Sequence, residues 1–507
     1  MHKRLRIQVG AMGAAALLAA GGLFVACQNT SGGGSGAGGG SVDGGGGAGG
    51  GSPIVSFAPQ GCGFTIQSRP EYLGFTPSQP TVGATPNIRR VRLGLGGNVE
   101  GTLGRADPAT SIGIAWQTDE GTDVSQVQWG ASADPTTWPA ANVVSGVTWD
   151  TPQGELNPDG NERMHEAYIC GLTAATTYYY RVGGGPAGSA QWGPVLTFTT
   201  TPAAGPATPV TIAITGDSRG EQSDAWQILQ RRLHVLGPTL AIFSGDVINL
   251  ATDQGEWEEW LDRAYLDTDN TTHLTLSSLL TLAAHGNHDN HTALFFGNLT
   301  LPQDNVKYPQ YGELFYSVDV GPVHVIVTDD SWVADPSGDS AYAGILQTWL
   351  DADLTAAAAN RTNVPWIITV NHRPAYSSSL HGMDPDVLLS RAFYAPIFQK
   401  YHVDMSFNGH DHDYERTQPL DIGADVNSPT VTTADQGTVF VTCAGSGADA
   451  YSAATSSFTA FSTDFTSGSA IGLYGILTAT ATTLKLDGHQ LLSDATDPIF
   501  DTYTITK

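Results

Sequence analysis

Asn408 to Arg416, with the sequence NGHDHDYER, is the stretch around which the rest of the chain can be interpreted. It places His410 and His412 one residue apart, directly after a glycine. The alternating apolar residues that precede it predict a β-strand ending in this loop. Because residues i and i+2 of an extended chain face the same side, both imidazoles are expected to point into one site. An isolated His-x-His pair is more often two solvated loop residues, so the interpretation depends on the rest of the sequence.

Four other segments follow the same plan, in which an apolar run ends in a turn that carries Asp, Asn or His. The turns are Gly216-Asp217, Gly245-Asp246, Gly286-Asn287-His288-Asp289 and Asn371-His372. Each is ordinary on its own, since Gly-Asp is a common turn. Their repetition at the carboxyl ends of predicted strands indicates one site at the edge of an α/β sheet. Carboxylate, amide and imidazole donors suit iron, zinc or manganese, and a carboxylate can bridge two ions that promote displacement at phosphorus.

In this order the motifs resemble those of the calcineurin-like metallophosphoesterase superfamily. His372-Arg373-Pro374 and the segment from His410 to Arg416 narrow the resemblance to purple acid phosphatases and their bacterial relatives. The resemblance implies two metal ions, in which Asp246 bridges. The first ion would take Asp217, Asp246 and His412, and the second would take Asp246, Asn287, His372 and His410.

The resemblance also implies a mechanism, in which a metal-bound hydroxide attacks phosphorus and His288 protonates the leaving oxygen. Histidine suits this task because its unperturbed pKa lies near neutrality. The alternative for His288 is a structural role in orienting its own loop.

Two positions depart from the family pattern. Asn249 stands where purple acid phosphatases have a tyrosine that binds ferric iron, so neither colour nor a ferric ion follows from the resemblance. Asn249 is either a further metal ligand or a loop residue. Arg219 replaces a usual glycine, and either contacts the substrate phosphate or pairs with a local acid. Arg373 and the loop histidines His291 and His381 are further candidates for substrate contacts, each equally open to being a surface residue.

The sequence predicts two domains of different fold class. Residues 87–202 contain short apolar stretches separated by turn residues, which predict an all-β antiparallel sandwich. The run from Leu172 to Val182 resembles fibronectin type III modules and the N-terminal domain of purple acid phosphatases. Residues 208–507 alternate predicted strands and helices, which indicates α/β, and the resemblance implies four αββα layers. Helical spacing occurs at 223–236, 254–265 and 345–358, and strands are predicted at 475–479, 483–486 and 502–506.

Residues 1–27 resemble a bacterial lipoprotein signal, with a basic start, a small apolar run and Cys27 as the lipidated residue. A plain secretory signal is the alternative. Residues 28–52 are a Gly/Ser-rich tether and residues 53–86 an irregular spacer or an added edge of the sandwich. We therefore expect an exported protein of the bacterial cell envelope, attached to the membrane through Cys27, or otherwise periplasmic or secreted. Three further cysteines leave at least one unpaired, and the sequence does not select the pair among Cys62, Cys170 and Cys443.

The formal net charge is −27, from 22 basic and 49 acidic residues, which disfavours nucleic acid as a partner. A small phosphorylated substrate is not excluded, because metal ions dominate the field of such a site. The predicted function is hydrolysis of phosphate monoesters by an exported dinuclear metal enzyme. The alternatives are a phosphodiesterase or nucleotidase on the same fold, and a surface-binding protein without turnover.

Overall fold

The computed structural model describes residues 55–69, 73–83, 85–97, 106–150, 162–219, 224–264, 275–303, 309–494 and 496–507. The predicted signal, Cys27 and the tether lie outside the described residues. The described residues belong to one compact unit. Within the described ranges, no helix is both long enough and apolar enough to cross a membrane.

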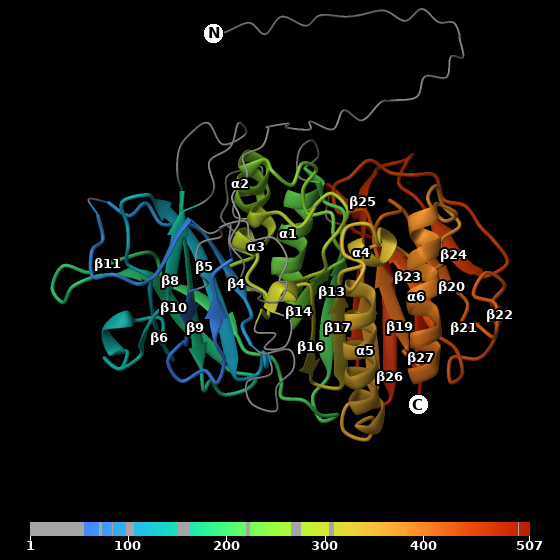
Figure 1. The fold of residues 1–507 in the computed structure, drawn as a ribbon, viewed down its shortest axis with the longest axis horizontal. Helices are drawn as coiled ribbons and strands as arrows, with labels where there is room; N and C mark the ends of the chain where they lie inside the picture. Colours follow the sequence, from blue (N-terminus) through green and yellow to red (C-terminus); the bar gives the residue numbers. More distant parts are fainter. Residues whose placement is uncertain are drawn as a thin grey trace, which may run out of the picture. The chain divides into compact units, whose positions relative to one another are not determined.

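The N-terminal part of the chain, here called the N-terminal sandwich, consists of two antiparallel five-stranded sheets and is rich in β-strands, as the sequence predicted (Figure 1). One sheet has the order β3 (Leu73–Pro77), β8 (Val147–Asp150), β9 (Glu162–Cys170), β5 (Ser111–Asp119) and β4 (Arg89–Gly94). The other runs β11 (Gln191–Trp192), β10 (Thr177–Gly184), β6 (Gln126–Gly130) and β7 (Val143–Ser145), with β12 (Leu196–Thr199) paired to β10. Because β3 pairs with β8, part of the region 53–86 is an edge strand rather than a spacer. A short pair, β1 (Ser56–Phe57) and β2 (Ile66–Gln67), precedes it.

One disulfide ties this sandwich to the chain that precedes it. Cys62 and Cys170 form the bond, with their Cα atoms 5.2 Å apart. Cys443 is buried and free. The sequence had left this choice of partners open.

Two further sheets form the α/β part of the chain. The six-stranded sheet has the order β15 (Thr281–Ala283), β14 (Leu240–Phe243), β13 (Val210–Thr215), β25 (Ala470–Ala479), β26 (Thr483–Leu492) and β27 (Ile499–Thr506). The seven-stranded sheet has the order β16 (Phe315–Val320), β17 (Val323–Thr328), β18 (Trp366–Val370), β19 (Met405–Asn408), β23 (Val439–Cys443), β20 (Tyr414–Thr417) and β24 (Thr459–Thr463). A small pair consists of β21 (Leu420–Asp421) and β22 (Thr430–Val431).

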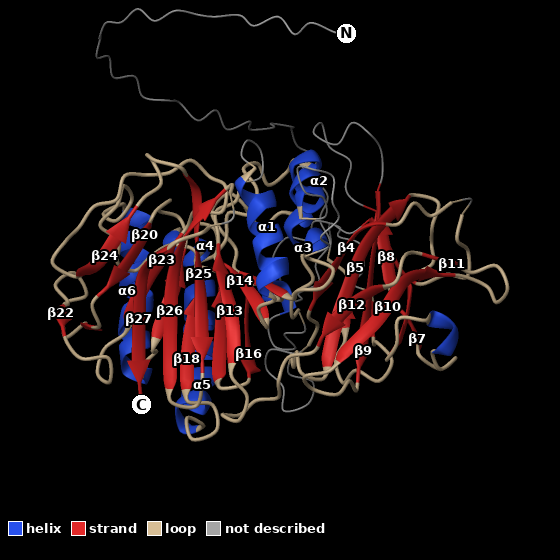
Figure 2. Cartoon of the chain, turned by 180° about the vertical axis from the view of Figure 1, so that it is seen from behind, coloured by secondary structure: helices blue, strands red, loops and turns tan. Residues whose placement is uncertain are grey.

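Helices cover the outer faces of these two sheets, giving the four layers that the resemblance implied. The helices are α1 (Ala225–Leu236), α2 (Gln254–Arg263), α3 (Ala293–Asn298), α4 (Ser331–Ala334), α5 (Tyr342–Ala359) and α6 (Pro385–Tyr401). α5 and α6 lie in front of the seven-stranded sheet in Figure 1, whereas α1 lies in front of the six-stranded sheet when the molecule is seen from behind in Figure 2.

Local signals fix two of these helices. Asp253 caps α2, because its side chain accepts hydrogen bonds from the backbone N–H groups of Gly255 and Glu256. Gly237 ends α1 in the left-handed conformation that glycine favours. Trp226 of α1 stacks on Trp260 of α2, with ring centroids 4.8 Å apart, and both are buried. Burial of such large aromatic rings fixes the helix pair on the sheet.

Parallel strands set the position of the candidate site. β13, β14 and β15 run parallel in one sheet, and β17, β18, β19 and β23 run parallel in the other. The loops that leave their carboxyl ends contact one another across the two sheets, for example through the bond from the Ser446 N–H to the Gly216 carbonyl at 3.1 Å.

Candidate metal centre

Every predicted metal ligand lies in a loop that follows a parallel strand. These candidate ligands come from both sheets, whereas the motif pattern had indicated the edge of one sheet. Asp217 follows β13, Asp246 follows β14, Asn287 follows β15, His372 follows β18, and His410 and His412 follow β19.

Four donor atoms converge at the position predicted for the second ion. Asn287 Oδ1 lies 2.9 Å from His372 Nε2 and 2.8 Å from His410 Nδ1. His372 Nε2 is 3.3 Å from both His410 Nδ1 and Asp246 Oδ1. His372 Nδ1 is 2.9 Å from the Ser244 carbonyl, which can only accept, so Nδ1 donates in either protonation state of the ring. Nε2 therefore faces the Asn287 and Asp246 oxygens, a position that suits either a proton or a bound cation.

The position predicted for the first ion has open donors. His412 Nδ1 donates to the Asp449 carbonyl at 2.7 Å, which leaves Nε2 unprotonated and 3.6 Å from Asp217 Oδ1. His412 Nε2 and Asp217 Oδ2 are buried and have no hydrogen-bond partner. Ligand atoms of Asp217, Asp246 and His372 all lie within 4.8 Å of one another. Buried polar atoms are normally satisfied, so this donor set fits bound metal ions.

The electrostatics of the centre favour positive charge. Burial raises the pKa of Asp217 to about 8, and the charge of Asp246 adds to the effect against that of His372. The pKa of His372 is raised to about 9, because Asp246 and Asp217 outweigh the effect of its burial. Burial lowers the pKa of His412 to about 3, which keeps that ring neutral and able to coordinate. A pair of cations would relieve the mutual repulsion of the buried carboxylates.

The backbone is bent sharply where it delivers these ligands. Asp217, Asp246 and His410 have φ values of 54°, 55° and 72°, in the left-handed region that non-glycine residues rarely adopt. A Cβ atom on Gly409 would lie 2.3 Å from Asp217 Oδ2, so only glycine fits between the two loops. Such strain concentrates at functional sites.

His288 lies at the edge of the centre, where the family's acid is expected. Its Nε2 is 4.0 Å from Asp246 Oδ2, and its side chain is 27% exposed, so a substrate can reach it. Its Nδ1 donates to the Asn249 carbonyl at 2.8 Å, while the Asn249 N–H donates to Glu256 Oε2 at 2.9 Å. Asn249 therefore orients His288 through its backbone, a role that the sequence did not suggest.

Arg219 pairs with a local acid, and this acid is the predicted bridging ligand. Its Nη2 is 3.1 Å from Asp246 Oδ2. Of the two alternatives that the sequence left open, the observed contact is the ion pair.

The other candidates for substrate contacts have different surroundings. Arg373 is buried and bonds to Asp330 and Asp386, so its guanidinium is engaged by two carboxylates. His381 Nδ1 is 2.8 Å from Asp384 Oδ2, and the His381 ring lies 4.9 Å from the ring of His410. His381 thus borders the centre, whereas Arg373 supports its loop.

Tyr451 is a residue at the centre that sequence reasoning missed. Its ring stacks on His412 at 4.1 Å and lies 5.4 Å from His381. Its stretch contains mainly small residues and no ligand-type pattern, so only the fold could place it here.

A second group of potential ligands, His285, His291 and Asp329, lies beside this loop. The two rings stack at 4.0 Å and 13°, and an ion cannot lie in the planes of both nearly parallel rings. His285 Nε2 also accepts the His291 N–H at 2.7 Å, and His291 Nε2 bonds to Asp329 at 2.7 Å. This group therefore closes the base of the loop that carries Asn287. His291, which the sequence suggested as a substrate contact, is part of this group and bonds to Asp329.

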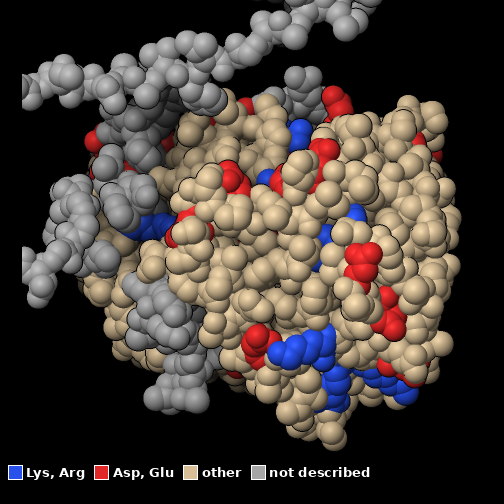
Figure 3. Space-filling model, turned by 45° about the vertical axis from the view of Figure 1, so that its right-hand side comes forward, with Lys and Arg blue, Asp and Glu red and all other residues tan. Residues whose placement is uncertain are grey.

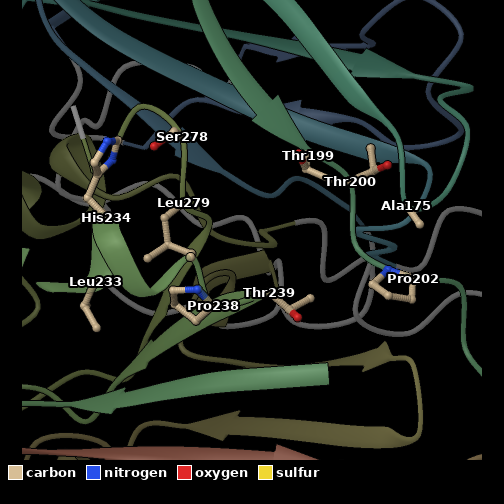
Figure 4. A pocket seen from close by; sticks show the side chains of 11 residues that line it. Ala175, Thr199, Thr200, Pro202, Leu233, His234, Pro238, Thr239, Ser278 and Leu279 are labelled. Carbon is tan, nitrogen blue, oxygen red and sulfur yellow. The ribbon is translucent and has the colours of Figure 1, made fainter. Parts of the chain in front are cut away.

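A cavity of about 400 Å³ lies elsewhere, with Thr200 and Pro202 on one side and Leu233 and His234 on the other (Figure 4). None of its lining residues belongs to the metal centre. On the surface, basic and acidic side chains lie interspersed on the face shown in Figure 3. Lys400 pairs with Asp351, and Arg263 pairs with Glu259.

Comparison with protein families shows which known domains the two parts of the chain are similar to. Residues 210–414 match the calcineurin-like phosphoesterases, and residues 99–200 match the N-terminal domain of purple acid phosphatases. The chain is thus similar, in this order, to a purple acid phosphatase N-terminal domain and to a calcineurin-like phosphoesterase domain.

Individual relatives agree with this domain pair. A purple acid phosphatase of Glycine max is 29% identical over 270 residues, which cover 50% of this chain and 53% of the relative. The Fe(3+)-Zn(2+) purple acid phosphatase 12 of Arabidopsis thaliana is 28% identical over 272 residues, covering 50% and 52%. The matches span about half the length of these relatives. A purple acid phosphatase from yellow lupin (Lupinus luteus) seeds shares the fold, with a TM-score of 0.60 and 18% identity over 83% of this chain and 74% of that chain.

Proposed function

We propose that this protein is a phosphoesterase that uses two metal ions to hydrolyse phosphate monoesters. The observation that carries the proposal is the convergence of potential ligand atoms, 2.8–3.3 Å apart, from Asp246, Asn287, His372 and His410. The metallophosphoesterase domain and the plant relatives support it. The sequence alone had suggested the same reaction.

The residues present fit a dinuclear centre. Asp217, Asp246 and His412 would hold one ion, and Asp246, Asn287, His372 and His410 the other. When bound, two such ions supply charge that neutralises the phosphate and activates water. Iron, zinc and manganese all suit this mixture of donors.

His288 supplies the proton for the leaving group in this proposal. The bond from Nδ1 to the Asn249 carbonyl fixes the ring so that Nε2 faces the centre. An imidazolium in this orientation can donate its Nε2 proton to the ester oxygen as the P–O bond breaks. Arg219 and His381, which border the same donors, are proposed to contact the phosphate.

Metal content per chain, measured with hydrolysis of nitrophenyl phosphate, tests the proposal. We expect two ions per chain, and hydrolysis that is lost after chelation and restored by manganese, zinc or iron. His412→Ala should lower metal content and abolish activity in a folded chain, because its Nε2 is an open donor of the first position. His234→Ala, which alters a histidine outside the centre, is the matched control and should leave both unchanged.

Three outcomes would each contradict a part of this proposal. A wild-type chain that takes up no ion after reconstitution would exclude the mechanism and favour a binding protein without turnover. Two ions retained by the His412→Ala variant would show that the ligand assignment is wrong. Faster hydrolysis of bis-nitrophenyl phosphate than of the monoester would favour the phosphodiesterase or nucleotidase alternative.

We also propose that the protein is exported, on the lipoprotein-like pattern of residues 1–27, and attached to the envelope through a lipid on Cys27. The N-terminal sandwich would then be a fibronectin type III-like module beside the enzyme domain. The partner is a small phosphorylated molecule rather than nucleic acid, in view of the net charge of −27. Cys27→Ala should release the protein from the membrane fraction, and continued attachment would contradict the lipid anchor.

A further inference from the structure

Arg219 is held against the bridging carboxylate by its backbone as well as by its charge. The turn after β13 is bonded to the turn after β14 at three points. The Asp217 N–H donates to the Gly245 carbonyl at 3.0 Å, and the Arg219 N–H to the Asp246 carbonyl at 3.4 Å. Ser218 Oγ donates to the Val247 carbonyl at 2.6 Å. These bonds hold the backbone of Arg219 next to the loop of Asp246, so its guanidinium needs only a short reach to that carboxylate.

The side chain of Arg219 is enclosed enough for its charge to matter. It is 22% exposed, its Nε is buried, and Nη2 lies 3.1 Å from Asp246 Oδ2, a fully buried oxygen. Arginine stays charged under all conditions in which a protein is folded. Water screens this charge less than it would at the surface, so an ion that shares Asp246 experiences its field.

The predicted metal ligands carry few negative charges. Two carboxylates, Asp217 and Asp246, are the only anionic groups among the predicted ligands, and the others are imidazoles and an amide. One of the two negative charges is shared with Arg219. The repulsion between a guanidinium and an ion grows with the charge on the ion, and is about one and a half times larger for a trivalent than for a divalent ion.

We propose that Arg219 sets the charge of the metal centre, so that it holds two divalent ions and disfavours a ferric ion. This inference rests on the proposed function and names the class of cofactor for the same site. It sets this chain apart from the Arabidopsis relative, whose name specifies an Fe(3+)-Zn(2+) pair. The expected ions are zinc, manganese or ferrous iron, which these imidazole and carboxylate donors suit.

Competition between ferric and zinc ions tests the inference on the full chain. Chelated protein is reconstituted in an equimolar mixture of the two, and bound metals are counted by elemental analysis and by the electron paramagnetic resonance of ferric iron. We expect two zinc ions per wild-type chain. In Arg219→Gln the ratio of bound ferric iron to zinc should rise about tenfold or more, since one unit charge beside the ion is removed.

Two further variants test whether the effect depends on the positive charge at residue 219. Arg219→Lys keeps the charge and should bind metals as the wild type does. Arg181→Gln removes an arginine of the N-terminal sandwich that bonds to Gln128, and should also match the wild type.

Each result decides the question. One ferric ion in every wild-type chain, or an unchanged ratio in Arg219→Gln, would overturn this inference. If such a ferric-containing chain still hydrolyses nitrophenyl phosphate, the proposed function stands and only the role of Arg219 falls. A wild-type chain that binds neither metal overturns both.

Discussion

Backbone carbonyls decide which nitrogen of each key histidine faces the centre. Ser244, Asp449 and Asn249 each accept a bond from Nδ1, of His372, His412 and His288 respectively. A carbonyl cannot donate a hydrogen bond, so Nδ1 is the donor in all three rings. The Nε2 atom of each ring therefore faces the candidate metal ligands. The rings of His372 and His412 then offer a lone pair to an ion, whereas His288, farther from the donors, is placed to exchange a proton.

Replacement of His288 by alanine separates these two roles. We expect His288→Ala to retain both ions and to slow hydrolysis by about 10²–10⁴-fold for an alkyl phosphate, the usual contribution of a general acid. The loss should be much smaller for nitrophenyl phosphate, whose leaving group needs little protonation. Metal content and kcat for the two esters give the result, with His234→Ala as control. Equal slowing for both esters would show that His288 does not act as the acid.

At the scale of elements, two consecutive carboxylates after β17 connect the loops of both sheets. Asp329 bonds to His291 in the loop that carries Asn287. Asp330 accepts bonds from Asn371 Nδ2 at 3.0 Å, from the Arg373 N–H at 2.6 Å and from Arg373 Nη1 at 2.8 Å. One strand end thus sets the distance between Asn287 and the neighbouring ligand His372.

Asp330→Ala should therefore reduce occupancy of the second metal position. The variant leaves Arg373 buried with a single acidic partner, Asp386, and removal of one member of a buried ion pair destabilises by about 3–5 kcal/mol. We expect a folded chain with one ion in place of two, and a lower midpoint of denaturant unfolding. Asp386→Ala, which removes the more exposed partner, is the control. Full occupancy in Asp330→Ala would contradict a positioning role for this carboxylate.

The metal motifs could be predicted because each lies within a few residues of a strand that its own apolar pattern reveals. The strands Leu240–Phe243 and Trp366–Val370 end directly before the predicted turns at Gly245-Asp246 and Asn371-His372. Helix α6 could not be predicted in this way, because its apolar residues are spread around the helix and Pro396 lies inside it.

Pairings between distant residues were also beyond the sequence. Arg373 and His291 resemble substrate contacts until the fold brings Asp330 and Asp329 to them. Cys62 and Cys170 are 108 residues apart, and no local pattern links them. The spacing of apolar residues predicts which face of a single helix or strand is buried. Contacts between distant residues depend instead on how several such elements pack together.

At the scale of the whole molecule, the N-terminal sandwich and the α/β part share a buried polar contact. Arg92 of β4 donates to the carbonyls of Gly297 and Asn298 at the end of α3. Nearby, Glu166 of β9 accepts bonds from the Tyr168 hydroxyl and, at 3.5 Å, from Thr300 Oγ1. Burial raises the pKa of Glu166 to about 8, although the charge of Arg92 opposes this shift. Both parts of the chain therefore meet at a carboxyl group that is protonated at neutral pH.

Replacement of Glu166 by glutamine should change how stability depends on pH. The pKa of Glu166 is raised above its ordinary value of 4.5, so folding takes up a proton, and stability falls as pH rises from about 4.5 to about 8. Glutamine keeps the shape of the protonated acid and cannot ionise. We expect Glu166→Gln to match the wild type at pH 5 and to be more stable by roughly a few kcal/mol at pH 9. Denaturant midpoints at the two pH values measure the difference, and Glu259→Gln, on the exposed side of α2, is the control. Parallel pH curves for Glu166→Gln and the wild type would show that this carboxyl is not the group that weakens the contact between the two parts of the molecule at high pH.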